Sequence, residues 1–427
     1  MLLIYAPLFR ASNIPLALMF LQMMSLALLV LVVFGNEAFT AIKKPQLILI
    51  ALILAVPLVS LLPFPEVPWG TLPGRDIYMP VLQGVAGADN DFMKSISLAG
   101  NATEYALWTL LPPLIVYIAA VNLPRHHLYT LVYVVLGIAV FQAILGLMQY
   151  GAGPKSPLHF GTPGSNTASG TWLNRDHYAG FLEMVFPVAL ALLAATIGIN
   201  RKRNRQKSNW RKKLAFMSTV KGNQAAIYAF ILVLMILALI FTKSRAGVGL
   251  AMVGLFISMF VFANRLGGSN VYGSVGTIIA VIVILAIEIG LAPVLDRFSV
   301  DPMEDLRLTI YSSSMEGIGS FFPIGSGAGT FPISYPFFQP VDLDAFINRA
   351  HNDYLEWIYD GGMLSIIAIG MFFVLYINGW RRLWIPQRWG TFRFIQAGAG
   401  IGIFLIILHS AIDFNLHKPA NAVFFAF

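Results

Sequence analysis

The stretch from 349 to 362, "RAHNDYLEWIYDGG", places basic, amide and acidic side chains directly before a long apolar run. Arg349 carries a guanidinium, which matches phosphate oxygens through paired, charge-assisted hydrogen bonds. His351 carries an imidazole, which can take a proton from a hydroxyl near neutral pH. Asp353 and Glu356, one helical turn apart, either orient the base or the acceptor, or cap the helix that begins there. This combination suits displacement of a lipid diphosphate by a sugar hydroxyl.

Three further polar clusters stand at the ends of apolar segments. They lie in "TWLNRDHYAGFLEM", "FTKSRAG" and "HSAIDFNLHKPANA", and their members are Asn174, Arg175, Asp176 and His177; Lys243 and Arg245; and His409, Asp413, Asn415, His417, Lys418 and Asn421. Each cluster alone is compatible with an interfacial anchor or a helix cap. Because all four clusters fall on the same predicted side of the membrane, we expect one shared site.

The composition indicates which elements must position these groups. Of the 427 residues, 57% are hydrophobic and 11% are charged, whereas soluble domains carry about a quarter charged residues. Many apolar runs reach the roughly 20 residues that cross a bilayer. The fold class is therefore expected to be an all-α polytopic membrane protein. The absence of cysteine excludes disulfides, thiolate nucleophiles and cysteine metal sites.

Apolar runs predict ten spanning segments, near 14–34, 46–62, 104–121, 129–150, 177–199, 224–242, 247–263, 275–292, 355–378 and 395–412. Residues 1–9 and 420–427 are expected to be parts of two further spans, which gives about twelve transmembrane helices. No cleavable signal peptide is expected, because the first residues lack both a basic start and a small-residue cleavage site.

Basic residues predict the orientation, because short cytoplasmic loops retain Lys and Arg. If the run at 200–213 is cytoplasmic, the same side receives more than half of the basic residues, including Lys43, Lys44, Arg125 and Arg265, and a single acid, Glu37. A basic run can also indicate nucleic-acid binding. Beside spanning helices we interpret it as a topology determinant that contacts anionic lipid headgroups, so no nucleic-acid partner is expected.

Three parts of the chain are expected: transmembrane helices over 1–292 with outer loops 63–103 and 151–176, a large outer loop over 293–354, and C-terminal transmembrane helices over 355–427. The large loop is too long for a simple connector. Within it, helical spacing predicts a helix whose apolar side carries Leu306, Ile310, Met315 and Ile318. This helix either lies in the outer membrane interface or packs as an ordinary loop helix.

Two other features of the large loop concern possible anion and metal binding. The glycines of "PIGSGAGTF", 323–331, would let backbone N–H groups approach an anion, but the lysine of a nucleotide-binding loop is missing. We expect either a flexible turn beside the membrane or the floor of an outer-facing site. Asp301, Glu304 and Asp305 offer carboxylates to a metal but show no fixed ligand spacing, so neither a metal nor a cofactor is expected.

With "RAHNDYLEWIYDGG", "TKSRAG", "LNRDHYAGFLEM", "FPIGSGAGTF" and "HSAIDFNLHKPANA", the chain resembles the O-antigen ligase and O-antigen polymerase superfamily of bacterial inner-membrane proteins. The resemblance is strongest from about 165 to 421. It implies a glycosyltransferase of the GT-C type with about twelve spans and a large periplasmic loop bearing short helices. Such enzymes transfer a glycan from undecaprenyl diphosphate to an acceptor hydroxyl, with inversion and without a metal ion.

The resemblance also assigns roles to individual residues. Arg245 matches an arginine that contacts the diphosphate, Arg307 matches a second one less closely, and His351 matches the essential histidine, the proposed base. Lys243 and Arg349 would add positive charge for the diphosphate. The glycan side of the outer site would be lined by Asn174, Arg175, His177, Asn352, Asp413 and His417, with Asp353 and Glu356 beside the base.

The acceptor stays open at this point. The extended "DFNLHKPANA" segment favours a polymerase, which builds O-antigen or exopolysaccharide from lipid-linked repeats. A ligase, which transfers a finished chain to the lipid A core of lipopolysaccharide, and an oligosaccharyltransferase acting on protein are alternatives. A flippase or transporter is a further alternative from another class, but it would bury charges near the bilayer midplane, as only Glu288 and Glu183 do here.

Overall fold

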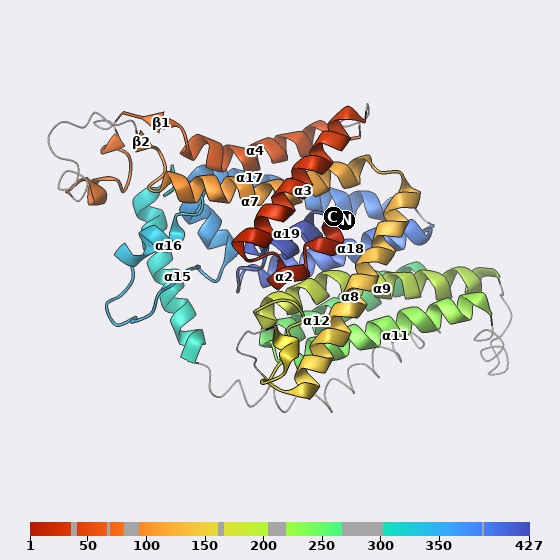
Figure 1. Ribbon diagram of the computed structural model, residues 1–427. Coiled ribbons are helices and arrows are strands. Elements are labelled where there is room, and N and C mark those ends of the chain that lie inside the picture. The colour runs from red at the N-terminus through yellow and green to blue at the C-terminus, as the bar shows by residue number, and fades with distance from the viewer. Residues whose placement is uncertain are drawn as a thin grey trace.

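A computed structural model of the chain describes residues 1–35, 41–65, 69–80, 94–160, 166–203, 219–266, 302–386 and 388–427. Within these ranges the fold is almost entirely helical (Figure 1). The strands β1 (Pro63–Phe64) and β2 (Lys94–Ser95) form one short antiparallel ladder. The short 3-10 turns are η1 (Asp76–Tyr78), η2 (Pro157–His159), η4 (Tyr335–Phe337) and η5 (Asn415–His417).

Eight of the described helices are long and apolar enough to cross a membrane. They are α3 (Pro15–Phe34), α7 (Gly100–Asn122), α8 (Arg125–Ala152), α9 (Arg175–Arg203), α11 (Val220–Phe241), α12 (Arg245–Leu266), α17 (Asp353–Trp384) and α18 (Thr391–His409). A ninth apolar helix, α4 (Lys44–Ser60), is shorter. The chain is thus a multi-pass membrane protein, as the composition predicts.

Three of the predicted spans differ from the structure or fall outside it. The segment 275–292, with Glu288, lies outside the described residues, as does Glu37. Residues 1–9 form two four-residue helices, α1 (Leu2–Tyr5) and α2 (Leu8–Ala11), because positive φ angles from Phe9 onward cannot continue a helix. Residues 420–427 lie largely in the eight-residue α19 (Pro419–Ala426). A count of twelve spans is therefore not confirmed.

Helix α9 is the centre of the bundle and packs against α18, α11 and α12. Nearly every residue from 177 to 195 is buried. Its closest neighbour is α18, where Gly398 and Gly402 stand one turn apart: a Cβ atom at Gly398 would lie 2.6 Å from the Pro187 carbonyl oxygen. Small residues at this spacing let membrane helices approach closely. The close α9–α18 contact brings the start of α9 beside the end of α18, where polar residues gather.

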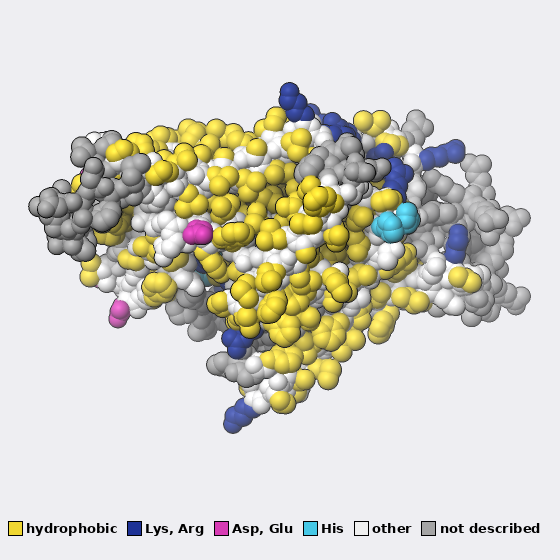
Figure 2. Space-filling model, turned by 45° about the horizontal axis from the view of Figure 1, so that its top comes forward, with side chains coloured by type: hydrophobic (Ala, Val, Ile, Leu, Met, Phe, Trp, Pro, Cys, Tyr) yellow, Lys and Arg dark blue, Asp and Glu magenta, His cyan; other side chains and the backbone are white. Residues whose placement is uncertain are grey.

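The outward faces of the spanning helices are apolar. Figure 2 shows hydrophobic side chains covering much of one face of the molecule. Phe20, Met23 and Leu31 of α3 and Phe256 and Phe260 of α12 are among the exposed large side chains. Apolar exposure of this extent is expected where lipid tails replace water as the solvent.

A second, smaller core lies beside α17. Helix α15 (Pro302–Phe321) packs on α17, and its Ile310 and Phe321 are buried with Phe331 of α16 (Phe331–Ser334). The predicted helix is confirmed and packs at least one face on protein. Leu306, Ile310 and Ile318 do contact this core, but Met315 is 55% exposed, so its predicted orientation was wrong. Met315 follows Leu306 by nine residues, about half a turn out of phase at roughly 100° per residue.

The glycine-rich loop packs against a kink in α17. Gly362 has φ 54° and ψ −133°, and a Cβ atom there would overlap the Pro323 carbonyl oxygen. Gly327 N–H donates to the Asp360 carbonyl at 2.8 Å, and Gly329 N–H donates to Asp360 Oδ2 at 2.6 Å. These N–H groups are therefore already used within the protein, and the loop serves as packing for the kink, not as a free anion cradle.

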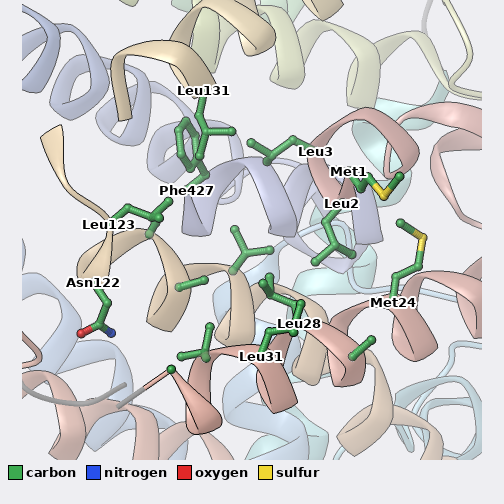
Figure 3. Close-up of a pocket in the computed structure, with 16 residues that line it drawn as sticks. Met1, Leu2, Leu3, Met24, Leu28, Leu31, Asn122, Leu123, Leu131 and Phe427 are labelled. Atoms are coloured by element: carbon green, nitrogen blue, oxygen red, sulfur yellow. The ribbon is translucent and has the colours of Figure 1, made fainter. Parts of the chain in front are cut away.

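An apolar cavity of about 580 Å³ lies among α1, α3, α7 and α8 (Figure 3). Its wall includes Leu28, Leu31, Val116 and Leu131, and Asn122 is the single polar side chain among its lining residues. This lining provides no acid, base or cation side chain. The residues with chemical potential gather elsewhere, at the start of α17 and the end of α18.

Candidate active site

The start of α17 fixes the position of His351. Asn352 is the N-cap, and its Oδ1 accepts hydrogen bonds from the N–H groups of Tyr354 at 3.0 Å and Leu355 at 3.1 Å. His351, directly before the cap, has φ 51°, a conformation that non-glycine residues rarely adopt. The Tyr311 hydroxyl of α15 donates to the His351 carbonyl at 2.8 Å. The cap and this hydrogen bond together hold a strained residue in place.

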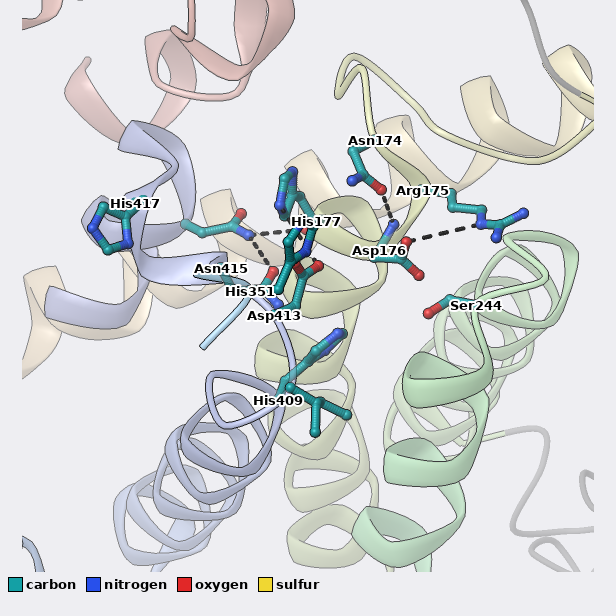
Figure 4. Close-up of polar contacts among 12 residues, drawn as sticks. Asn174, Arg175, Asp176, His177, Ser244, His351, His409, Asp413, Asn415 and His417 are labelled. Atoms are coloured by element: carbon teal, nitrogen blue, oxygen red, sulfur yellow. Dashed lines mark hydrogen bonds and ion pairs between the residues drawn. The ribbon is translucent and has the colours of Figure 1, made fainter. Parts of the chain in front are cut away.

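The His351 side chain faces Asp413, which lies in the turn after α18 (Figure 4). The distance from His351 Nδ1 to Asp413 Oδ1 is 3.2 Å. An ionised carboxylate can only accept, so Nδ1 is the donor, and in the neutral imidazole Nε2 then has a free lone pair. Within the described residues Nε2 of His351 has no hydrogen-bond partner. In this geometry Nε2 is the nitrogen that could accept a proton.

Asp413 has a second imidazole neighbour. His177 Nε2, on α9, lies 3.7 Å from Asp413 Oδ2, and both side chains are buried. Burial alone would raise the pKa of the Asp413 carboxyl, but the hydrogen bond with His351 and the nearby His177 and His409 imidazoles hold that pKa below its ordinary value. The carboxylate therefore stays charged beside His351 and can stabilise an imidazolium there.

Backbone hydrogen bonds tie the Asp413 turn to both helices. Asp413 N–H donates to the His409 carbonyl at 2.9 Å, which continues the last turn of α18. Asp353 N–H donates to the Ser410 carbonyl at 2.8 Å, which joins this turn to the start of α17. The Phe414 ring contacts both imidazoles, with its centroid 4.9 Å from that of His351 and 4.7 Å from that of His177.

A second polar cluster adjoins the first. His417 of η5 has Nδ1 2.5 Å from Asp353 Oδ1 and Nε2 3.2 Å from Glu356 Oε1. Glu356 also binds Arg349, whose Nη1 is 2.5 Å away, and accepts from the Ala350 N–H at 2.9 Å. Burial lowers the pKa of Arg349, but the Glu356 carboxylate more than offsets this and raises it.

This second cluster changes the expected partner of the base. In the structure Asp353 and Glu356 contact His417 and Arg349, whereas Asp413 contacts His351. The capping role considered for Asp353 and Glu356 belongs to Asn352 instead. The reason is geometric, because both acids are buried and their carboxylates are already bound to His417 and Arg349.

The start of α9 contributes the third group. Asn174 Oδ1 accepts from the Asp176 N–H at 2.7 Å, and Arg175 Nε lies 3.9 Å from Asp176 Oδ2. Figure 4 shows Ser244, the residue before Arg245, beside Asp176. The turn between α11 and α12 thus reaches this region. Lys243 has φ 54°, and its Nζ lies 5.2 Å from the centroid of the Tyr150 ring, against α8.

Arg307 reaches the site from α15. Its Nη1 donates to the Ile412 carbonyl at 3.1 Å, directly beside Asp413. Arg307 is therefore a neighbour of the His351–Asp413 pair, as a phosphate-binding arginine next to a base would need to be. Arg245 begins α12, and its convergence with Arg307 in one cavity stays a prediction.

Sequence reasoning missed the roles of several residues that support this site. Tyr311 holds the His351 backbone, and Asn421 donates from Nδ2 to the His177 carbonyl at 2.9 Å. Trp172 Nε1 in turn donates to Asn421 Oδ1 at 3.1 Å. Tyr311 stands one turn after Arg307 on α15, so a polar stripe at i, i+4 was the signal that could have revealed it.

No metal-binding group appears among the described residues, where no three His, Asp or Glu side chains are arranged to hold an ion. Asp301 lies outside the described residues, and the side chains of Glu304 and Asp305 are not described. Metal binding by Asp301, Glu304 and Asp305 therefore stays an untested alternative. A chelator experiment can test it.

Glu183 does not line a transport path in the described part of the structure. Its Oε2 is 3.0 Å from Nδ1 of His409, and both side chains are fully buried between α9 and α18. Neither residue lines the cavity of Figure 3. A buried acid that is paired inside a tight helix–helix contact gives no support to the transporter alternative.

The fold and the site define a multi-pass membrane protein with acid–base and cationic groups gathered where several helices begin or end. Residues 230–370 match a family model described as O-antigen ligase. This match covers part of the chain and supports the resemblance to the O-antigen ligase and polymerase superfamily, whose members act in polysaccharide assembly. No curated protein gives a match. The matched range contains Arg245, Arg307 and His351, while Asp413 lies beyond it.

Proposed function

We propose that the protein is a glycosyltransferase that moves a glycan from undecaprenyl diphosphate to a sugar hydroxyl of an acceptor. The reaction takes place at the periplasmic face of the bacterial inner membrane, during assembly of O-antigen or exopolysaccharide. The observation that carries the proposal is the hydrogen bond between His351 Nδ1 and Asp413 Oδ1, with Arg307 bound to the adjacent Ile412 carbonyl. A base and a phosphate-binding cation are thereby neighbours.

The proposed reaction is one inverting displacement. The acceptor oxygen forms a bond to the anomeric carbon while the bond from that carbon to the diphosphate oxygen breaks. The electron pair of the broken bond leaves with the diphosphate, and the hydroxyl proton passes to His351 Nε2. Asp413 stabilises the imidazolium that results, because its carboxylate lies against Nδ1.

Arg307, with Arg245 at the start of α12, is proposed to stabilise the diphosphate, whose negative charge grows as the glycosidic bond breaks. Guanidinium groups suit this task, because they stay charged and bind phosphate oxygens in a bidentate manner. Cations that already stand in position stabilise the transition state more than groups that must first reorient, and so they lower the activation barrier more. The mechanism needs no metal, since cations of the chain take its place.

The acceptor is proposed to be another lipid-linked repeat or growing chain, which makes the enzyme polymerase-like. Ligation to the lipid A core is the second candidate, because the matching family model carries that description. The test is deletion of the gene followed by gel electrophoresis of surface polysaccharide. Single repeats on the surface support polymerisation, whereas finished chains that accumulate on the lipid carrier support ligation. Unchanged polysaccharide in the deletion strain contradicts the proposal.

A further inference from the structure

Lys418 shares an aromatic neighbour, Phe414, with the proposed base but was given no role above. It stands between η5 and α19, and its Nζ is 4.7 Å from the centroid of the Phe414 ring. The same ring contacts His351 at 4.9 Å and His177 at 4.7 Å between centroids. The Phe414 ring therefore contacts His351, His177 and the Lys418 ammonium.

The cations of this region fall into two groups. Arg349 is bound to Glu356 at 2.5 Å, and Arg175 lies 3.9 Å from Asp176. In the part of the chain that the structure describes, neither Arg307 nor Lys418 has a carboxylate at ion-pair distance. Arg307 donates only to a carbonyl, and Lys418 rests on the face of an aromatic ring. Of these four cations, Arg307 and Lys418 are therefore the two without a carboxylate partner.

The surroundings of Lys418 make it responsive to an anion. Burial, followed by the like charge of Arg349, lowers the pKa of Lys418 to about 8, and the carboxylates of Asp413, Glu356 and Asp353 offset part of this effect. An anion that enters beside the ammonium would therefore stabilise its charged form. A lysine ammonium also suits a diphosphate, because its three N–H donors can turn toward oxygens on either phosphate.

We infer that Lys418 binds the diphosphate of the lipid-linked donor together with Arg307. The inference rests on the proposed function and adds a cation that neither the sequence motifs nor the family match assigns. In the displacement, Lys418 would stabilise the charge that develops on the leaving diphosphate.

The test measures binding of undecaprenyl diphosphate and undecaprenyl monophosphate to the purified full chain in lipid nanodiscs. Lys418→Met keeps the apolar stem against Phe414 but removes the charge, and Lys418→Arg keeps a charge. We expect Lys418→Met to weaken diphosphate binding about tenfold or more, with a much smaller loss for the monophosphate. Lys418→Arg should restore most of the affinity. Lys155→Met, at an exposed lysine of the 151–176 loop, is the matched control and should bind as wild type does.

A pH series separates a charge role from a packing role. Because a lysine is cationic below its pKa, wild-type affinity for the diphosphate should fall as the pH rises above about 8. The Lys418→Met variant should lack this decline. A folded Lys418→Met protein with wild-type diphosphate affinity and an unchanged pH series would overturn the inference alone. A wild-type protein that binds neither lipid would instead overturn the proposed function on which the inference rests.

Discussion

His351 and Asp413 are 62 positions apart in the chain, and His351 Nδ1 lies 3.2 Å from Asp413 Oδ1. The pair joins the residue before α17 to the turn after α18. On the other side of the carboxylate, His177 Nε2 of α9 lies 3.7 Å from Asp413 Oδ2, so the α9–α18 contact places a second imidazole beside the pair. Helix packing inside the bundle thus brings three polar side chains from separate helix ends to one place at its edge.

Asp413→Asn should lower kcat on the order of 10²-fold or more while the KM for donor changes little. The amide would keep the size of the side chain but could no longer stabilise an imidazolium, and it could favour the wrong tautomer of His351. The measurement is transfer by purified enzyme with a lipid-linked glycan. Asp344→Asn, at an exposed loop acid, is the control. Equal activity of the two variants would remove Asp413 from the mechanism.

The low pKa of Asp413 also predicts how this residue affects stability. Because the folded-state pKa is depressed, the carboxylate contributes stability at every pH above its unfolded-state value. That contribution is lost only in acid, below about pH 4. An acid limb in the activity profile near neutral pH therefore cannot come from Asp413.

The sequence predicted the helices well, because long apolar runs leave few choices in a membrane. It also predicted that polar helix ends share a site, and the contacts of His177, His351 and Asp413 place three of those ends together. It could not predict which acid meets which histidine. Asp353 is two residues from His351 in the chain, yet it contacts His417, because the start of a helix turns neighbouring side chains in different directions.

His351→Ala should reduce transfer about 10²–10⁴-fold and leave diphosphate binding nearly intact, since a base acts only in the chemical step. His351→Gln distinguishes a base from a structural residue. The amide can replace a hydrogen bond but cannot take up the proton, so this variant should be as inactive as the alanine variant. Near-normal polysaccharide from a well-expressed His351→Gln strain would exclude the base assignment.

Arg307→Lys and Arg245→Lys should each lower kcat/KM by about tenfold or more with normal membrane insertion. Each substitution keeps a positive charge but loses the bidentate fork that fits phosphate oxygens. Arg307 also loses its hydrogen bond to the Ile412 carbonyl, so the adjacent Asp413 turn should become more mobile. The measurement is transfer kinetics at varied donor concentration. Arg393→Lys, at a partly exposed arginine of α18 far along the chain from the site, is the control. Full activity of both site variants would rule out a diphosphate role for these arginines.

Excess chelator should leave the transfer rate of purified protein undiminished, because cations of the chain are proposed to neutralise the diphosphate. The check is a rate measurement with and without EDTA, followed by addition of magnesium or manganese. Loss of activity that either metal restores would instead identify Asp301, Glu304 and Asp305 as metal ligands.

The interaction between Glu183 and His409 should contribute to the free energy of unfolding, so that either residue without the other destabilises the protein. The two side chains are fully buried and their atoms Oε2 and Nδ1 are 3.0 Å apart. Glu183→Met would leave the imidazole without its partner, and His409→Leu would leave a buried carboxylate alone. Each single change should cost about 3–5 kcal/mol, whereas the double change to two apolar residues should cost much less than the sum. Unfolding of the four proteins in mixed detergent micelles measures this cycle. Additive losses would mean that the two side chains do not stabilise each other.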